Sequence, residues 1–538
     1  MSNDFRQVRE RSIDALQLTA IEYEHQPTGA KHFHLKSDAA ENVFLVALRT
    51  VPEDSTGVAH ILEHTVLCGS ERYPVRDPFF LMIRRSLNTF MNAFTGADYT
   101  AYPFASQNRK DYFNLMSVYL DAVFHSRLHP LDFAQEGHRL EFTEPGNPDS
   151  PLEYKGVVYN EMKGDMSSPL SRLYHGVQER LYPTSTYHFH SGGDPAAIPA
   201  LTYQALRDFY KTHYHPSNAT FMTYGNIPAE EQQEFISRQA LNGFTSANSK
   251  AINVAPVTRY QAPKADDFTY PVDEDDLSDK THIVIGWLLG RNTDLDMLLK
   301  CHLLSDALLD TSASPLRKAL ETTGLATAAS PLCGFQEDYL ETAFLCGVEG
   351  SEPENAEAVE QLVMDVLQDV AANGIPVEQV EAVLHQLELS QRELGGDGYP
   401  YGLQLILSCM PAAIHRGDPI GLLDLEATME KLRSEVRDPA FIKQLVQELL
   451  LDNPHRVRVV MKPDRNMAKQ SAADEQAALA RIKASLTTPQ SSEIVAQAAQ
   501  LAERQAEEED LSILPKVTRD DIPAERDWTA IHSQASPQ

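Results

Sequence analysis

The sequence has few cysteines, no apolar leader and no long hydrophobic run. Its five cysteines include no CxxC pair, and widely spaced thiols in odd number indicate reduced cysteines rather than a disulfide framework. The first residues mix both charge signs and lack the apolar core of a signal peptide. The longest apolar stretches fall short of the roughly 20 residues that a membrane span needs. We therefore expect a cytoplasmic protein that does not contact a membrane.

Positive charge is also scarce. Lys and Arg together number 46 against 77 Asp and Glu, which gives a formal net charge of -31. Proteins that hold nucleic acid neutralise its phosphates with Lys and Arg, so we expect no nucleic-acid partner. The acidity fits simple solubility, and it also fits attraction of cationic peptides into a cleft. Net charge alone does not decide between these two.

The length and the hydrophobic pattern predict several domains. A chain of 538 residues exceeds one core, since a domain has roughly 100–200 residues. Residues 18–50 are strand-like, and several segments between 58 and 163 have apolar residues at the three- and four-residue spacing of helices. A polar, acidic segment at 261–280 then predicts a boundary near 262. We expect residues 1–262 to form the first domain, the one that carries the chemistry described below.

The following region repeats the order of the first. A strand-like run at 281–289 precedes a long amphipathic helix at 294–309, which indicates an internal duplication and a second, metal-free domain over 263–465. Residues 466–512 are rich in Ala, Gln, Glu and Lys and predict a helical hairpin connector, followed by an extended tail over 513–538. The predicted fold class is α+β, with two similar α/β-sandwich domains in which a sheet packs with helices.

His60, Glu63 and His64 form an H-x-x-E-H motif. Histidines four residues apart project from one face of a helix, so both imidazoles can bind one ion, and neutral imidazole is a preferred zinc ligand. The carboxylate of Glu63 could then act as general base toward a water on that ion. By itself the string also fits two half-exposed helix histidines beside a solvated glutamate.

Five blocks, in order along the chain, carry a family resemblance: HILEHTVLCGSERYPVRDPF, SLNTFMNAFTGADYTAYPFAS, KGVVYNEMKG, SGGDPAAIPALTY and HYHPSNA. Together they resemble the presequence protease branch of the pitrilysin and insulin-degrading zinc metallopeptidases. The resemblance implies an endopeptidase for unfolded peptides with one Zn²⁺ per chain. It implies that His60, His64 and Glu161 bind the zinc and that Glu63 is the catalytic base.

Two further expectations concern Glu161 and the substrate. Glu161 lies in an apolar-periodic helix, where a carboxylate near the buried side would be costly without a metal. The resemblance also implies that Asn92, Ala93, Phe94 and Thr95 form an edge strand that pairs with the substrate backbone. An ordinary sheet edge is the alternative.

Other histidines occur in pairs: His32 with His34, His188 with His190, and His213 with His215. Each pair could bind a metal in principle. We expect surface or hydrogen-bonding roles for them instead.

Enzymes of the resembled family have two similar halves, joined by a helical connector, that close around an unfolded peptide. Their second half supplies an Arg and Tyr pair near the zinc, and this sequence has no counterpart of that pair. We therefore expect one of three cases: the chain works with a second half-subunit, it forms a homodimer, or it is a truncated enzyme. The alternative to an active endopeptidase is a half-enzyme subunit that binds zinc and peptide but needs its partner for turnover.

Overall fold

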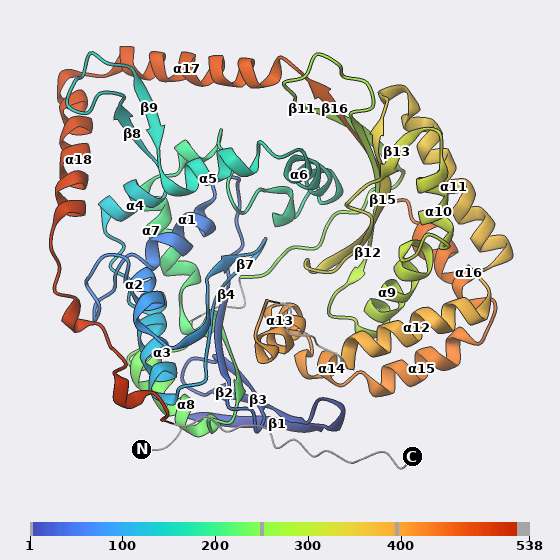
Figure 1. Cartoon of the computed structure of the whole chain (residues 1–538), viewed down its shortest axis with the longest axis horizontal. Helices are drawn as coiled ribbons and strands as arrows, with labels where there is room; N and C mark the ends of the chain where they lie inside the picture. Colours follow the sequence, from blue (N-terminus) through green and yellow to red (C-terminus); the bar gives the residue numbers. More distant parts are fainter. Residues whose placement is uncertain (1–3, 248–251, 393–397, 525–538) are drawn as a thin grey trace, which may run out of the picture.

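The computed structural model describes residues 4–247, 252–392 and 398–524, which contain two large sheets flanked by helices (Figure 1). The first sheet has the strand order β1-β2-β3-β10-β4-β7-β5, with β6 also paired to β7. Strand β10 runs parallel to β3 and antiparallel to β4. The strands are β1 (Phe5–Ile13), β2 (Leu18–His25), β3 (Lys31–Lys36), β4 (Asn42–Arg49), β5 (Asn88–Met91), β6 (Phe94–Thr95), β7 (Tyr99–Ser106) and β10 (Ala219–Gly225).

The second sheet repeats the part of the first that has the order β3-β10-β4-β7-β5. Its order is β11-β16-β12-β15-β13, with β14 also paired to β15, and β11 runs parallel to β16 as β3 does to β10. Its strands are β11 (Lys264–Pro271), β12 (Thr281–Arg291), β13 (Ala326–Ala329), β14 (Gly334–Gln336), β15 (Glu341–Ser351) and β16 (Arg456–Asp464). The predicted α+β class with two similar sheet-and-helix units is confirmed.

Helices bury both faces of strand β4. Phe44, Val46 and Leu48 point into one core with helices α1 and α3, because alternate residues of a strand face opposite sides. Val43 and Leu45 point into the other core. The helices near the first sheet are α1 (Val58–Val66), α2 (Pro78–Arg85), α3 (Arg109–Phe124), α4 (Pro130–Glu136), α5 (Val157–Asp165), α6 (Pro169–Leu181), α7 (Tyr203–His213) and α8 (Ala229–Ile236); a small hairpin, β8 (Arg139–Phe142) and β9 (Leu152–Lys155), lies beside them.

The two units exchange helices across their junction. Helix α13 (Tyr401–Ile414) lies in the range predicted for the second domain, yet it packs on the first sheet through Leu403, Ile406 and Met410. Conversely, α6 packs on the second sheet through Leu173 and Val177. The remaining helices of the second unit are α9 (Leu295–Leu309), α10 (Pro315–Thr322), α11 (Ala356–Asn373), α12 (Val377–Arg392), α14 (Pro419–Leu423), α15 (Glu426–Val436) and α16 (Phe441–Val446).

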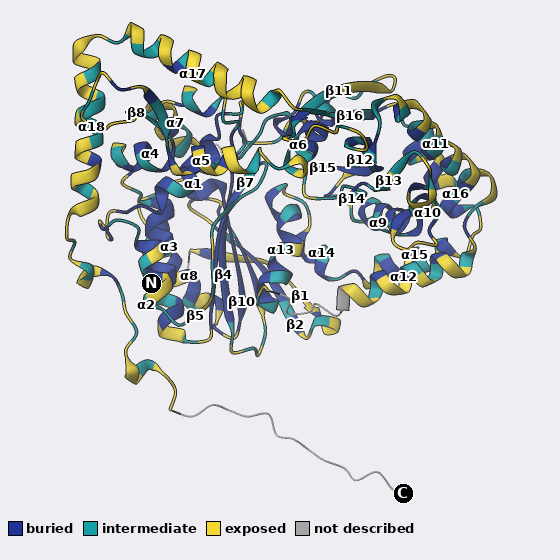
Figure 2. Ribbon diagram, turned by 45° about the horizontal axis from the view of Figure 1, so that its top comes forward, coloured by how far each residue is buried: buried dark blue, intermediate teal, exposed yellow. Residues whose placement is uncertain are grey.

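Two long, mostly exposed helices follow the second sheet (Figure 2). Helix α17 (Met467–Ser485) runs back toward the first unit and α18 (Thr488–Ala506) descends along its outer side (Figure 1). Leu479 of α17 packs on the β8–β9 hairpin. The described part of the predicted tail, 513–524, stays near the first unit, where Asp521 pairs with Lys110; residues 525–538 lie outside the described part. None of the helices described is both long and apolar enough to span a bilayer.

Candidate active site

Helix α1, which carries the H-x-x-E-H motif, starts where two glycines meet. Gly57 precedes the helix with φ of 70°, a conformation that favours glycine. A Cβ atom on Gly57 would lie only 2.7 Å from the carbonyl oxygen of Gly192. The absent side chain therefore lets the Gly192 turn, from the SGGDP block, approach the start of α1.

The two motif histidines are oriented by hydrogen bonds at Nδ1. His60 Nδ1 lies 3.0 Å from the Gly192 carbonyl oxygen, and His64 Nδ1 lies 3.1 Å from Glu136 Oε2. Both partners are acceptors, so each Nδ1 donates and each Nε2 keeps its lone pair. The imidazole rings lie 5.0 Å apart between centroids. This is the tautomer in which Nε2 is ready to bind a metal.

Glu161 lies close to both imidazoles. Its Oε2 atom is 3.8 Å from Nε2 of His60 and 3.8 Å from Nε2 of His64. The structure therefore brings together the three residues expected to bind zinc. The burial argument for Glu161 was wrong, because its side chain is 53% exposed. Val158 and Met162 occupy the buried side of α5, and Glu161 faces the cavity instead.

Glu63 is buried beside these groups and is hydrogen-bonded. Thr95 Oγ1 donates to Glu63 Oε2 over 3.0 Å, which leaves Oε1 without this bond. Burial raises the pKa of Glu63, while His64, His60 and the Thr95 hydroxyl act in the opposite direction. For His64, burial would lower the pKa, but the hydrogen bond to Glu136 and the charge of Glu63 raise it overall.

These side chains border a cavity of about 540 Å³. Its lining includes all of the residues predicted for the site: His60, Glu63, His64, Asn92, Ala93, Phe94, Thr95 and Glu161. Phe94 and Thr95 form β6, whereas Asn92 and Ala93 lie in the connection between β5 and β6 rather than in a strand. Phe80 and Leu67 add apolar surface to the same cavity.

The donor set fits a divalent cation. An ionised Glu161 carboxylate facing two imidazole lone pairs places three electron-rich atoms together, and a cation between them would remove their repulsion. Two imidazoles and one carboxylate are the ligand types of a catalytic zinc site with an open fourth position. His60, His64 and Glu161 could therefore hold a metal here. A carboxylate oxygen of Glu63 also lies within 4.8 Å of a ring nitrogen of each histidine.

Sequence reasoning missed three contributors: Glu136, Gly192 and the hydroxyl role of Thr95. Each contacts the motif across a long sequence separation, from helix α4, a turn and strand β6. Metal-binding histidines usually donate their second N–H to a carboxylate or carbonyl, and His60 and His64 both have such a partner here. Nothing in the spacing identified which residues they are.

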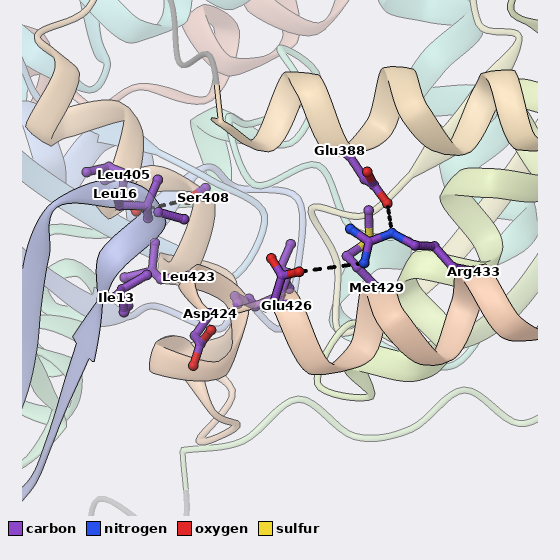
Figure 3. Close-up of a pocket in the computed structure, with 13 residues that line it drawn as sticks. Ile13, Leu16, Glu388, Leu405, Ser408, Leu423, Asp424, Glu426, Met429 and Arg433 are labelled. Atoms are coloured by element: carbon purple, nitrogen blue, oxygen red, sulfur yellow. Dashed lines mark hydrogen bonds and ion pairs between the residues drawn. The ribbon is translucent and has the colours of Figure 1, made fainter.

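A second, smaller cavity lies far from this chemistry, between the β1–β2 connection and helices α13, α14 and α15 (Figure 3). Its volume is about 60 Å³. Its charged members have ion-pair partners: Arg433 contacts both Glu388 and Glu426, and Asp424 pairs with Arg11. Apolar side chains such as Leu16 and Leu405 supply much of the rest. We assign no chemistry to this cavity.

Comparisons with known proteins place the chain in a family. Residues 49–143 match the model described as insulinase (peptidase family M16), and residues 200–387 match the peptidase M16 inactive domain. Residues 461–536 match a domain described as associated with subfamily C of the M16 peptidases. The chain belongs to the M16 peptidase family. Its relatives agree with the presequence protease branch that the sequence blocks indicated.

Two relatives illustrate the match. The mitochondrial presequence protease of Xenopus laevis is 40% identical over 95% of this chain and 50% of its own length. Presequence protease 1 of Arabidopsis thaliana, chloroplastic/mitochondrial, is 36% identical over 97% of this chain and 49% of its own length. The chain thus spans about half the length of the curated relatives it matches.

A solved structure shares the fold. The crystal structure of a protease from Helicobacter pylori matches with a TM-score of 0.64 at 17% identity, covering 85% of this chain and 99% of that chain.

The expectation of a cytoplasmic protein was wrong, since the similar presequence proteases are mitochondrial or chloroplastic. Net charge and the composition of the first residues could not identify a compartment.

Proposed function

We propose that this M16 chain is a zinc-dependent endopeptidase for unfolded peptides, with one catalytic zinc held by His60, His64 and Glu161. The observation that carries the proposal is the equal 3.8 Å approach of Glu161 Oε2 to Nε2 of both histidines. Zinc bound there supplies Lewis-acid chemistry, which makes water more acidic and polarises a peptide carbonyl.

Glu63 is the general base in this proposal. Its Oε2 atom accepts from Thr95, so Oε1 is the atom available to take a proton from the attacking water. The same carboxyl can return that proton to the leaving amine as the peptide bond breaks. Burial raises the pKa of Glu63, which makes its carboxylate a stronger acceptor for the proton of the attacking water.

The segment from Asn92 to Thr95 is proposed to hold the substrate backbone. It lines the same cavity as Glu63 and lies at the edge of the first sheet. Main-chain hydrogen bonds to an added strand fix the register of a peptide without reading most of its side chains. Selectivity for unfolded peptides rather than for one sequence follows from this mode of binding.

The test compares a quenched peptide of about 20 residues, cleaved by the native chain, by Glu63→Gln and by the exposed control Glu71→Gln. Glu63→Gln keeps all three proposed ligands, so zinc content should be unchanged while kcat falls by at least about 10²-fold. Glu71→Gln should match the native chain in both measurements. Equal hydrolysis by all three proteins would refute the assignment of Glu63.

A second candidate function rests on length. Because the chain spans about half of its curated relatives, it could be a half-enzyme that binds zinc and peptide and turns over only with a second half-subunit or a second copy of itself. Mass measurement in solution, run with the same peptide assay, separates the two functions. Turnover by the isolated chain at the rate of two-half relatives would eliminate the half-enzyme; turnover restored only by an added second half would establish it.

A further inference from the structure

A second cluster of metal-ligand side chains lies beside the proposed catalytic site. Asp165, His175 and His190 each offer one ligand atom, and these atoms all lie within 4.8 Å of one another. Asp165 ends helix α5, one turn beyond Glu161; His175 lies on α6; His190 precedes Gly192, the partner of His60. We propose that Asp165, His175 and His190 form a second zinc site, distinct from the catalytic one.

The distances in the two clusters are similar. His175 Nε2 lies 4.0 Å from Asp165 Oδ2, compared with 3.8 Å between each catalytic imidazole and Glu161. Ligand atoms around one zinc lie roughly 3.3–3.5 Å apart when each is about 2.1 Å from the ion. The rings of His175 and His190 are stacked, 3.5 Å apart between centroids and tilted by 29°, whereas those of His60 and His64 are T-shaped. Because the lone pair of an imidazole lies in its ring plane, one ring of the stacked pair must turn before both can bind the same cation.

His190 provides the second, independent observation. Both of its ring nitrogens are buried without a hydrogen-bond partner in the described part of the chain. A buried polar atom without a hydrogen-bond partner costs about 1–3 kcal/mol of folding free energy. A bound ligand that contacts a ring nitrogen of His190 would remove this cost at that atom.

The surroundings favour a cation over an anion. His175 and His190 line a cavity of about 400 Å³ that Arg172 and Arg180 also border. Arg172 Nε donates to the Met166 carbonyl, and Arg180 pairs with Asp266, so both guanidinium groups already have protein acceptors. Asp165 is aligned as a ligand, because its Oδ1 accepts from Ser171 Oγ while Oδ2 faces His175.

A metal at this position would link three parts of the active site. It would join the end of the Glu161 helix to α6, which packs on the second sheet, and to the turn that holds His60 through Gly192. Two imidazoles and one carboxylate are three protein ligands of the types that zinc favours. Asp165 borders the cavity of the catalytic site, whereas His175 and His190 border the other cavity. The site would therefore fix Glu161 and Gly192 relative to the second unit.

The experiment counts zinc per chain. Native protein is saturated with zinc, passed through gel filtration into zinc-free buffer, and analysed for metal beside His190→Phe, Asp165→Asn, His64→Phe and the control His188→Phe. We expect two equivalents in the native chain and in His188→Phe, and one in each of the other three. Phe preserves the ring stacking at 190, and the histidine nitrogens it removes make no hydrogen bonds, so the fold should persist; circular dichroism checks this.

Cobalt replacing zinc gives a separate readout, since each site adds its own visible absorption. One equivalent in the native chain, two in His190→Phe, or loss of the second equivalent in His188→Phe would overturn the second site. Phosphate binding that depends on His190 while zinc does not would overturn it in favour of an anion site. Failure of the catalytic proposal is distinguishable, because it would show as unchanged zinc in His64→Phe.

Discussion

His64 donates its Nδ1 proton toward Glu136 Oε2 across 3.1 Å, and this contact fixes the ring so that Nε2 faces Glu161. Glu136 is buried at the end of α4, and Gln135 Nε2 donates to its other oxygen. Because both oxygens of this buried carboxylate are hydrogen-bonded, the Glu136 side chain has little freedom to move and restricts the orientation of the His64 ring. The zinc affinity of the site therefore depends on a residue that does not touch the metal.

Glu136→Gln should weaken zinc binding by about 10–100-fold, because a neutral amide supports the ligand histidine less well than a carboxylate. Competition with a chelator measures the change in affinity. The control is Glu144→Gln, which alters an exposed residue of the loop after β8 and should leave the affinity unchanged. Equal affinities for native protein and Glu136→Gln would show that the hydrogen bond to His64 does not support the site.

Gly57→Ala tests the close approach of the Gly192 turn to α1. Two effects oppose a Cβ atom at Gly57: backbone strain at positive φ, and a distance of only 2.7 Å to the carbonyl oxygen of Gly192. Gly29 also has a positive φ, but the space around its Cβ position is open. We expect Gly57→Ala to lower zinc affinity as well as stability, since the turn that holds His60 must move. Gly29→Ala should lower stability alone, by about 1 kcal/mol. Indistinguishable zinc affinities for the two variants would contradict this account of the turn.

A matched pair of leucine variants tests whether the packing of α13 on the first sheet stabilises the fold. Leu405 of α13 is 1% exposed in the core against the first sheet, and Leu389 of α12 is 45% exposed. Leu405→Ala should lower the free energy of unfolding by about 2–5 kcal/mol. Leu389→Ala should change it by less than about 0.5 kcal/mol. Urea unfolding of both variants makes the comparison, and similar losses would mean that α13 does not hold the first sheet.

Two buried histidines predict a loss of stability in acid. His32 and His34 both contact Thr223 Oγ1, and burial lowers the pKa of His34 to about 4. Between pH 6.5 and 4 the unfolded chain binds a proton at this position that the folded chain does not. The free energy of unfolding therefore falls as the pH drops through this range, by roughly 3 kcal/mol for His34.

His34→Asn should flatten that pH dependence, and His385→Asn, at an exposed position on α12, should preserve it. Denaturant unfolding at several pH values between 7 and 4 provides the slopes. The same slope in His34→Asn and native protein would assign the acid sensitivity to other groups.

Local periodicity was enough to predict the parts of the fold and site that depend on neighbouring residues. The spacing of His60 and His64 placed both rings on one helix face, and repeated strand–helix order indicated two similar units. Glu161 came from the family resemblance, and the argument from its burial failed because periodicity alone did not show that it faces a cavity. Asn92 and Ala93 fall between strands, although the block that contains them suggested one continuous edge.

Long-range features were not predictable from the sequence. Helix α13 is apolar on most of its surface, so its pattern shows that it is buried but cannot show which sheet buries it. Glu136 meets His64 only through the packing of α4 against α1. The sequence places His190 next to His188 and predicts a surface or hydrogen-bonding role, whereas the fold stacks His190 on His175. Each of these depends on tertiary contacts between elements far apart in the chain.

The most direct measurement of the central claim is anomalous diffraction at the zinc absorption edge from crystals of this chain grown with zinc. We expect a peak about 2.0–2.2 Å from Nε2 of His60, Nε2 of His64 and a carboxylate oxygen of Glu161. Glu63 should lie beside the peak without ligating it. A zinc-saturated crystal with no peak at these three residues, or with Glu161 turned away from the ion, would contradict the account.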